Sequence, residues 1–144
     1  MTSSSFAPCI ECICYRLRRA ARVTTRNFDR RLQSSGLQAT QFTVLAILTA
    51  QKEITVTELA DRLSIERTGL LRNHRVLEKR GLINIRRGED KRRRLLSPTR
   101  KGRAAATEAL PLWRKAQEEA FRSLPRNSRE SFLSMLQTIE AAGS

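Results

Sequence analysis

The side chains best suited to chemistry in this sequence are arginines, and they are concentrated in one part of the chain. The 144 residues include 28 Lys and Arg against 14 Asp and Glu, a net charge of +14. Residues 62–103 carry 15 basic and four acidic side chains, a net charge of +11. Arginine binds phosphate with two parallel hydrogen bonds and recognises guanine edges. The cluster therefore indicates a polyanionic partner, either nucleic acid or an anionic membrane surface.

The basic cluster falls on two short helices and a hairpin. Thr55 and Glu58 have the spacing of a capping box, which predicts the start of a short helix. A second helix is expected over 66–80, followed by strands over 82–87 and 93–97 that form a hairpin. This order is that of a winged helix-turn-helix, in which the second helix enters the major groove of DNA.

The second of these helices separates its side chains into two faces. At about 100° per residue, Leu70, His74 and Leu77 share one sector, which we expect to face the core. The opposite sector carries a hydroxyl and three cations. A solvated helix face is also often charged, but the basic hairpin that follows favours DNA binding. The predicted DNA-binding residues are Arg67, Thr68, Arg72, Arg75, Lys79, Arg86, Arg87, Asp90, Lys91 and Arg92.

Amphipathic helices flank this region on both sides. The periodicity predicts one long helix over 10–32, ended by Gly36, and another over 39–51. On the C-terminal side, Thr99 is expected to cap a helix that continues to about residue 123. Pro111 should kink that helix or split it, and Asn127 is expected to cap a last helix. The apolar faces of 10–32 and 128–140 are large for a monomer, which predicts a homodimer.

A specific set of residues connects these elements to a known family. Asp-x-Arg followed by Thr-x-x-Gly stands directly after the helix-turn-helix, as Asp90, Arg92, Thr99 and Gly102. The upstream matches are Leu37, Gln41, Leu45, Leu48, 57–60, Leu63, Arg67, Thr68, Arg72 and 77–83. On these residues, the segment 36–103 resembles the MarR family of winged-helix transcriptional regulators. Gly69, Asn84 and Pro98 depart from the family pattern, which affects the expected operator sequence.

The resemblance implies a mainly α fold with a small β-hairpin wing. It assigns residues 1–35 to an N-terminal dimerisation helix, 36–103 to the DNA-binding lobe and 104–144 to C-terminal dimerisation helices. Asp90 is expected to brace the wing and Arg92 to enter the minor groove. The implied function is that of a homodimeric repressor on a pseudo-palindromic operator, released by a small-molecule effector or an oxidant. The resemblance places the effector between the first, second and fifth helices, where Trp113 either lines the pocket or packs in the core.

Three cysteines, Cys9, Cys12 and Cys14, open the first helix. A metal site would need a fourth ligand, and the single histidine, His74, is expected in the core. Some members of the family sense peroxides through a cysteine near the same helix, so a thiol switch is a second interpretation. The favoured interpretation is that the three are small apolar residues buried at a dimer interface. No metal and no cofactor are expected.

Other classes of protein receive less support. The sequence has no Gly-rich phosphate loop, no zinc-protease motif and no Ser-His-Asp set, so an enzyme is not expected. Residues 1–8 lack the features of a secretion signal, and the odd cysteine count fits a reducing cytoplasm. No membrane association is expected. Two alternatives stay open, a thiol or metal sensor acting through the cysteines and a sequence-neutral nucleic-acid-binding protein.

Overall fold

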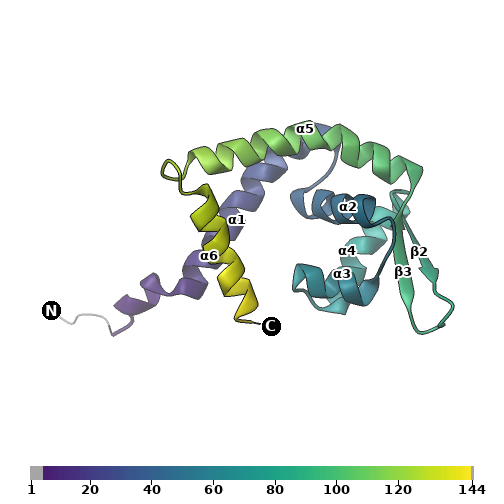
Figure 1. The fold of residues 1–144 in the computed structure, drawn as a ribbon, viewed down its shortest axis with the longest axis horizontal. Helices are drawn as coiled ribbons and strands as arrows, with labels where there is room; N and C mark the ends of the chain where they lie inside the picture. The colour runs from purple at the N-terminus through teal and green to yellow at the C-terminus, as the bar shows by residue number, and fades with distance from the viewer. Residues whose placement is uncertain (1–4, 144) are drawn as a thin grey trace.

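Helices make up most of the chain in the computed structural model, which describes residues 5–143 (Figure 1). The N-terminal segment 1–4, part of the stretch in which no secretion signal is expected, lies outside the described residues. The elements in chain order are η1 (Ala7–Glu11), α1 (Ile13–Leu32), η2 (Gln33–Ser35), α2 (Ala39–Gln51), β1 (Ile54–Thr55), α3 (Val56–Leu63), α4 (Arg67–Lys79), β2 (Ile83–Arg87), β3 (Arg94–Pro98), α5 (Arg100–Arg122) and α6 (Arg129–Ala141).

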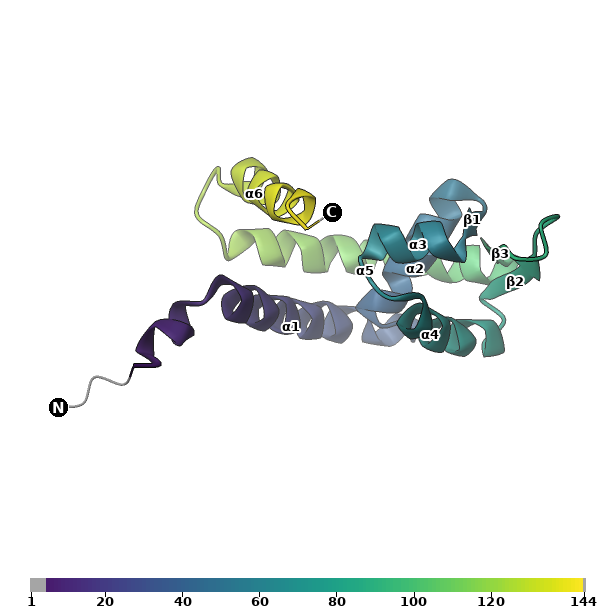
Figure 2. The ribbon, with the colours of Figure 1, turned by 90° about the horizontal axis from the view of Figure 1, so that it is seen from below.

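The long helix α5 connects two parts of the molecule. Figures 1 and 2 show α2, α3, α4 and the strands gathered around one end of α5, with α1 and α6 at its other end. The first part has a core in which Leu45, Leu48, Leu59 and Leu96 are fully buried. α6, in contrast, buries none of its residues. The winged helix-turn-helix is therefore well packed within one chain, while the α1 and α6 end is open.

The strands form a sheet in the order β1-β3-β2, with both pairings antiparallel. Ile83 pairs with Pro98 at the base of the hairpin, and Arg87 pairs with Arg94 near its tip. The short strand β1, in which Ile54 pairs with Leu96, was not predicted from the sequence. Pro98, expected to end the second strand, is its last paired residue.

The predicted helix boundaries around the DNA-binding lobe are confirmed. The Thr55 hydroxyl accepts the Glu58 amide at 3.1 Å, and the Glu58 carboxylate accepts the Thr55 amide at 2.9 Å. Gly36 and Gly81, which follow η2 and α4, have φ of +71° and +69°, a region in which glycine is favoured. Local capping chemistry therefore sets the start of α3 and the end of α4.

Two predictions about the flanking helices are wrong, and one of two alternatives for a third is excluded. The helix expected over 10–32 is interrupted at Cys12, whose extended backbone (ψ 126°) separates η1 from α1. Pro111 does not split α5, because the N–H that it lacks would bond to Thr107, and both residues lie on the exposed face where water can replace the bond. Asn127 does not cap α6, since Ser128 holds the N-cap position without a side-chain cap bond.

The start of α5 lies against the turn that follows α4. The Thr99 hydroxyl donates to the Gly81 carbonyl at 2.6 Å and accepts the Gly102 amide at 2.9 Å. A Cβ built on Gly102 would lie 1.9 Å from the Leu82 carbonyl oxygen. The Thr-x-x-Gly pattern thus has a structural reason, because threonine caps the helix and glycine allows the two backbones to approach.

We expect Gly102→Ala to lower the free energy of unfolding by about 2–4 kcal/mol, because the carbonyl at 1.9 Å is backbone and cannot move aside easily. Gly69→Ala is the matched control, since no atom lies within 4 Å of a Cβ at that position. It should stabilise α4 by up to about 1 kcal/mol. Urea denaturation measures both, and equal midpoints for the two variants would contradict the close approach.

Candidate nucleic-acid interface

Helix α4 has the two faces that the sequence predicts. Leu70 and Leu77 are 1% exposed and His74 is 0% exposed, so this face packs into the core. The opposite face carries Thr68, Arg72, Arg75 and Lys79, all of them exposed. The helix therefore presents three cations and a hydroxyl to solvent, while its opposite side is buried in the core.

The C-terminal end of α4 is fixed to its neighbours by polar contacts. Lys101 on α5 donates to the Arg80 carbonyl at 2.9 Å, and the Arg80 guanidinium lies 3.5 Å from the Gln41 side-chain oxygen on α2. The amide of Leu82 donates to the Leu77 carbonyl at 2.9 Å. These contacts connect the cationic helix to both α2 and α5, so its orientation follows theirs.

The tip of the hairpin is braced by Asp90. Its carboxylate accepts the backbone amide of Arg92 at 3.2 Å, and its carbonyl accepts the amide of Arg93 at 2.8 Å. Gly88 closes the turn by donating its amide to the Arg93 carbonyl at 2.8 Å. Asp90 thus orders the backbone that carries Arg92, while the Arg92 side chain stays exposed.

Arg86 is engaged within the protein. Its guanidinium donates two hydrogen bonds to the Glu53 carboxylate, at 3.0 and 2.8 Å. Glu53 precedes β1, so the pair joins the two outer strands across β3. Sequence reasoning missed Glu53 because the partners are 33 positions apart and β1 was not predicted. The contact neutralises one of the cations assigned to the interface.

Of the remaining predicted residues, Arg67, Arg75, Arg87 and Arg92 border two recesses beside the wing, while Thr68, Arg72, Lys79, Asp90 and Lys91 line neither. One, of about 450 Å³, lies between the start of α3, the start of α4 and β3, and the other, of about 260 Å³, lies between α4 and the hairpin. The first is lined by Thr55, Val56, Thr57, Glu58, Arg67, Arg92, Arg93 and Arg94. The second is lined by Arg75, Glu78, Ile85, Arg86, Arg87 and Arg94. The fold therefore brings Arg67 to Arg92 and Arg75 to Arg87, although each pair is far apart in sequence.

The first recess contains one carboxylate among its arginines. The hydroxyl and backbone amide of Thr55 hold the pKa of Glu58 below its ordinary value, and the charges of Arg93 and Arg62 act in the same direction. Glu58 is therefore ionised at neutral pH. Thr57 and Glu58 line this recess but were not among the predicted DNA-binding residues, since the capping box had accounted for that segment.

The cysteines lie apart from this interface. Cys9, Cys12 and Cys14 are free thiols and all three are exposed in the single chain, so their expected burial requires a second subunit. Within residues 5–143, no group of three or more His, Cys, Asp and Glu side chains is arranged to hold a metal ion. In the same range, no helix has the length and apolar character needed to span a bilayer. A metal-sensing interpretation of the cysteines gains no support.

Comparisons with known proteins identify the family. The MarR family model matches residues 35–94, which contain the helix-turn-helix and most of the wing. A crystal structure of the transcriptional regulator MosR of M. tuberculosis in complex with DNA is 41% identical, covers 91% of this chain and 98% of its own, and has a TM-score of 0.78. The chain belongs to the MarR family of winged-helix transcriptional regulators.

Two further relatives agree with this assignment. The transcriptional repressor CouR, solved bound to a 23-mer DNA duplex, is 32% identical, with coverage of 94% of this chain and 96% of its own and a TM-score of 0.81. The HTH-type transcriptional regulator YwoH of Bacillus subtilis is 26% identical over 118 residues, 82% of this chain and 86% of its own. The family consists of regulators and not of enzymes, as the sequence predicts.

Glu53→Gln should release Arg86 and strengthen binding to duplex DNA. We expect the dependence of affinity on salt to steepen by about one unit per wing, because one more cation can pair with phosphate. Glu89→Gln, in the exposed turn, controls for the loss of one negative charge. The double variant E53Q/R86Q should lose the gain. Equal salt dependence for E53Q and the unchanged protein, measured by fluorescence anisotropy, would contradict this role of Glu53.

His74 should make folding sensitive to acid. It is fully buried, neither ring nitrogen has a hydrogen-bond partner among the described residues, and burial lowers its pKa to about 4. The unfolded chain binds the proton below about pH 6.5, so stability is complete above that pH and falls as the pH approaches 4. Relative to His74→Leu, the unchanged protein should lose about 2 kcal/mol between pH 7.5 and 5. If urea denaturation gives the same pH dependence of the unfolding free energy for the unchanged protein and for His74→Leu, this prediction is contradicted.

Proposed function

We propose that this regulator is a homodimeric repressor that binds a pseudo-palindromic DNA site, one half-site per protomer. The observation that carries the proposal is the exposed cationic face of α4 next to a wing whose Arg92 backbone is braced by Asp90. An α-helix fits the major groove, and an arginine at a wing tip can enter the adjacent minor groove. Of the predicted residues, Arg67, Thr68, Arg72, Arg75, Lys79, Arg87, Lys91 and Arg92 are the proposed contacts, with Asp90 and Arg86 positioning the wing.

A homodimer is favoured by the apolar side chains that are exposed at the α1 and α6 end of the molecule. Phe6, Ile10 and Ile13 are 75%, 58% and 64% exposed, and Met135 on α6 is 57% exposed. A groove of about 1080 Å³ runs between α1, the second half of α5 and α6. Half of its lining residues are apolar, and these are Ala20, Val23, Phe28, Ala116, Ala120, Phe121, Leu124, Phe132 and Leu133. A second copy of the chain would cover these surfaces.

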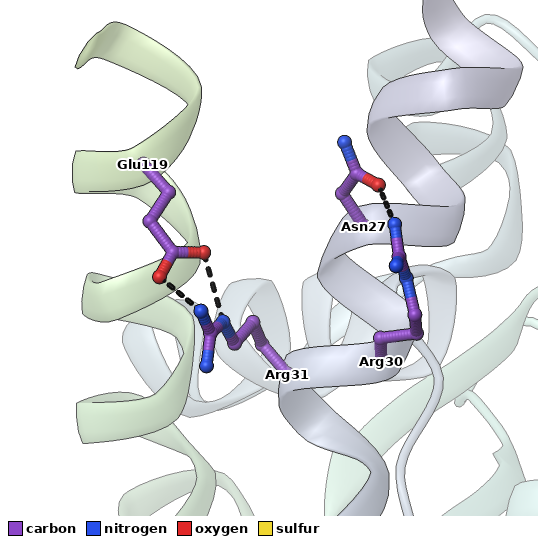
Figure 3. Close-up of polar contacts among 4 residues, drawn as sticks. All are labelled: Asn27, Arg30, Arg31 and Glu119. Carbon is purple, nitrogen blue, oxygen red and sulfur yellow. Dashed lines mark hydrogen bonds and ion pairs between the residues drawn. The ribbon is translucent and has the colours of Figure 1, made fainter. Parts of the chain in front are cut away.

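An ion pair beside this groove connects the dimerisation helices. Figure 3 shows Arg31 on α1 reaching Glu119 on α5, and its Nε lies 2.8 Å from the carboxylate. Arg30 is hydrogen-bonded to Asn27 within α1 and lies on the same rim. The pair holds α1 against α5, so the N-terminal dimerisation helix assigned to 1–35 packs on the C-terminal dimerisation helices assigned to 104–144. α5 also continues through residue 103 into the DNA-binding lobe.

A small-molecule effector is the proposed signal. The relative CouR has been solved bound to p-coumaroyl-CoA and is 31% identical to this chain. The region between α1, α2 and the start of α5 is the proposed effector site, since it joins the two parts of the molecule. Trp113 stacks on Phe42 of α2 with ring centroids 5.9 Å apart, so it packs against the core and borders this region.

A thiol sensor is a second candidate, favoured by the exposure of all three cysteines. Cys9 and Cys12 are joined by one 3-10 turn, in which the Cys12 amide donates to the Cys9 carbonyl at 3.3 Å. Cys14 follows in the first turn of α1. Oxidation here would act on the proposed dimerisation helices, so it would change the spacing of the two DNA-binding lobes in the dimer.

Selection from random duplexes, followed by titration of the selected site at several salt concentrations, tests the proposed repressor. Arg72→Ala should relax sequence preference at one position per half-site, a loss of about 1–3 kcal/mol of discrimination. Arg92→Ala should weaken binding to A·T-rich flanks and reduce the salt slope by about one unit per wing. Asp90→Ala should partly reproduce Arg92→Ala, because the Arg92 backbone loses its brace.

Three results would contradict the proposal. The first is that no sequence is enriched over bulk DNA, which would favour a sequence-neutral nucleic-acid-binding protein. The second is a complex with one chain per site, measured by light scattering, which would exclude the dimer. The third is identical behaviour of Arg72→Ala and Arg92→Ala, which would mean that helix and wing do not read DNA in different ways.

Replacement of Cys9, Cys12 and Cys14 by Ser should leave DNA affinity unchanged under reducing conditions, since the thiols lie outside the interface. Mild peroxide treatment separates the candidates. If oxidation weakens binding by the unchanged protein but not by the triple variant, the thiol sensor is supported, with mass spectrometry locating the modified sulfur. Loss of affinity in the reduced and folded triple variant would contradict the placement of the cysteines.

A further inference from the structure

The outer face of α1 carries an unpaired row of arginines outside the candidate interface. Arg18, Arg22 and Arg26 follow one another at steps of four, so they lie within about 80° on one side of the helix. All three are exposed, and among the described residues none of them has a carboxylate or hydrogen-bond partner. We name Arg18, Arg22 and Arg26 the α1 stripe.

The α1 stripe is separate from the groove proposed for the second subunit. The groove is lined by other positions of α1, among them Arg19, Val23 and Asn27, and by none of the three stripe residues. A second chain can therefore fill the groove without contacting the stripe. α1, which carries the stripe, lies toward the opposite end of the molecule from the wing in both Figure 1 and Figure 2.

Repulsion between the like charges of the stripe destabilises α1. Like charges four positions apart destabilise a helix by about 0.2–0.5 kcal/mol per pair, and the stripe contains two such pairs. The nearest acid on the same side is Asp29, whose carboxylate already accepts the Ala39 amide at 2.7 Å. An anion that binds along the row offsets this cost, and a polyanion releases counterions as it does so.

The chemistry of the stripe favours the DNA backbone over a membrane. A helix that lies on a bilayer needs apolar side chains beside its cations. Of the exposed large apolar side chains of α1, Ile13 falls on the opposite side of the helix from Arg22 and Val23 lines the groove, so that Tyr15 alone lies beside the stripe. Arg18 to Arg26 spans about 12 Å along the helix axis, with about 6 Å between charges, so the row can follow successive phosphates of one strand. Arginine also pairs with phosphate bidentately.

We propose that the α1 stripe is a second, sequence-neutral surface for duplex DNA, through which the protein bridges a second DNA segment to the one held by α4 and the wing. This inference goes beyond the proposed repressor function, since it concerns a different face and requires no operator. It assigns a role to charge that lies outside the winged helix-turn-helix.

A bridging assay with mixed-sequence DNA tests the proposal without knowledge of the operator. A 100-bp duplex on beads is loaded with protein, and capture of a fluorescent 40-bp duplex is measured at several salt concentrations. R18Q/R22Q/R26Q should reduce capture at least about tenfold and lower the salt slope by about three units per protomer. Binding to a single short duplex should stay unchanged, because the stripe lies outside the interface.

Two further variants serve as controls. R114Q/K115Q/R122Q removes three exposed cations from α5 and should leave capture unchanged. R18K/R22K/R26K keeps the charge and should retain capture to within about threefold. Circular dichroism checks that all variants keep the helical content of the unchanged protein, which we expect because removal of like charges should not unfold α1.

Several outcomes would overturn the proposal. Full capture by the Gln variant would show that the two DNA-binding lobes of a dimer bridge two duplexes without the stripe. An equal loss in the α5 control would show that only total charge matters. A loss of affinity for the single short duplex would place the stripe on the same DNA as α4. Stripe-dependent binding of phosphatidylserine vesicles, without capture of a second duplex, would assign the surface to a membrane.

Discussion

The position of α4 and the wing depends on the close approach of two backbone segments at the start of α5. Gly102 lies so close to the Leu82 carbonyl that no side chain fits between them. The same carbonyl accepts the Thr99 amide at 3.0 Å, and the Thr99 hydroxyl donates to Gly81. The end of α4, the start of β2, the end of β3 and the start of α5 therefore meet in one hydrogen-bonded junction. The cationic helix and the wing keep their mutual orientation because both leave from it.

The effective positive charge of α4 and the wing is smaller than the composition of this segment suggests. Residues 62–103 have a net charge of +11, but Arg86 is committed to Glu53 and Glu58 contributes an ionised carboxylate beside Arg93. Both acids belong to segments that precede the basic cluster. The net potential therefore depends on the fold, which brings these acids to the wing.

Sequence reasoning succeeded where the relevant signal is local. The faces of α4 follow from helical periodicity, the start of α3 from a capping box, and the turn after α4 from a glycine at positive φ. The core position of His74 follows from the same periodicity. These features require only contacts within a few residues, so the pattern was sufficient to predict them.

Sequence reasoning failed where distant contacts or competing backbone states decide the result. β1 is two residues long and exists because Ile54 pairs with Leu96. The Arg86–Glu53 pair depends on that strand, so it could not be predicted without it. The interruption at Cys12 and the uncapped start of α6 lie where little tertiary packing constrains the chain. The specific DNA contacts depend on a partner that one chain does not contain.

The continuity of α5 through Pro111 makes this helix a lever between the two ends of the molecule. Its 23 residues span about 35 Å, and its first turn is locked into the junction with α4 and the wing. A tilt of about 5° at the α1 and α6 end therefore displaces the wing by about 3 Å. That distance is close to the rise of one base pair, so in the proposed dimer a small rearrangement far from the DNA is sufficient to change the spacing of the two DNA-binding lobes relative to the helical repeat.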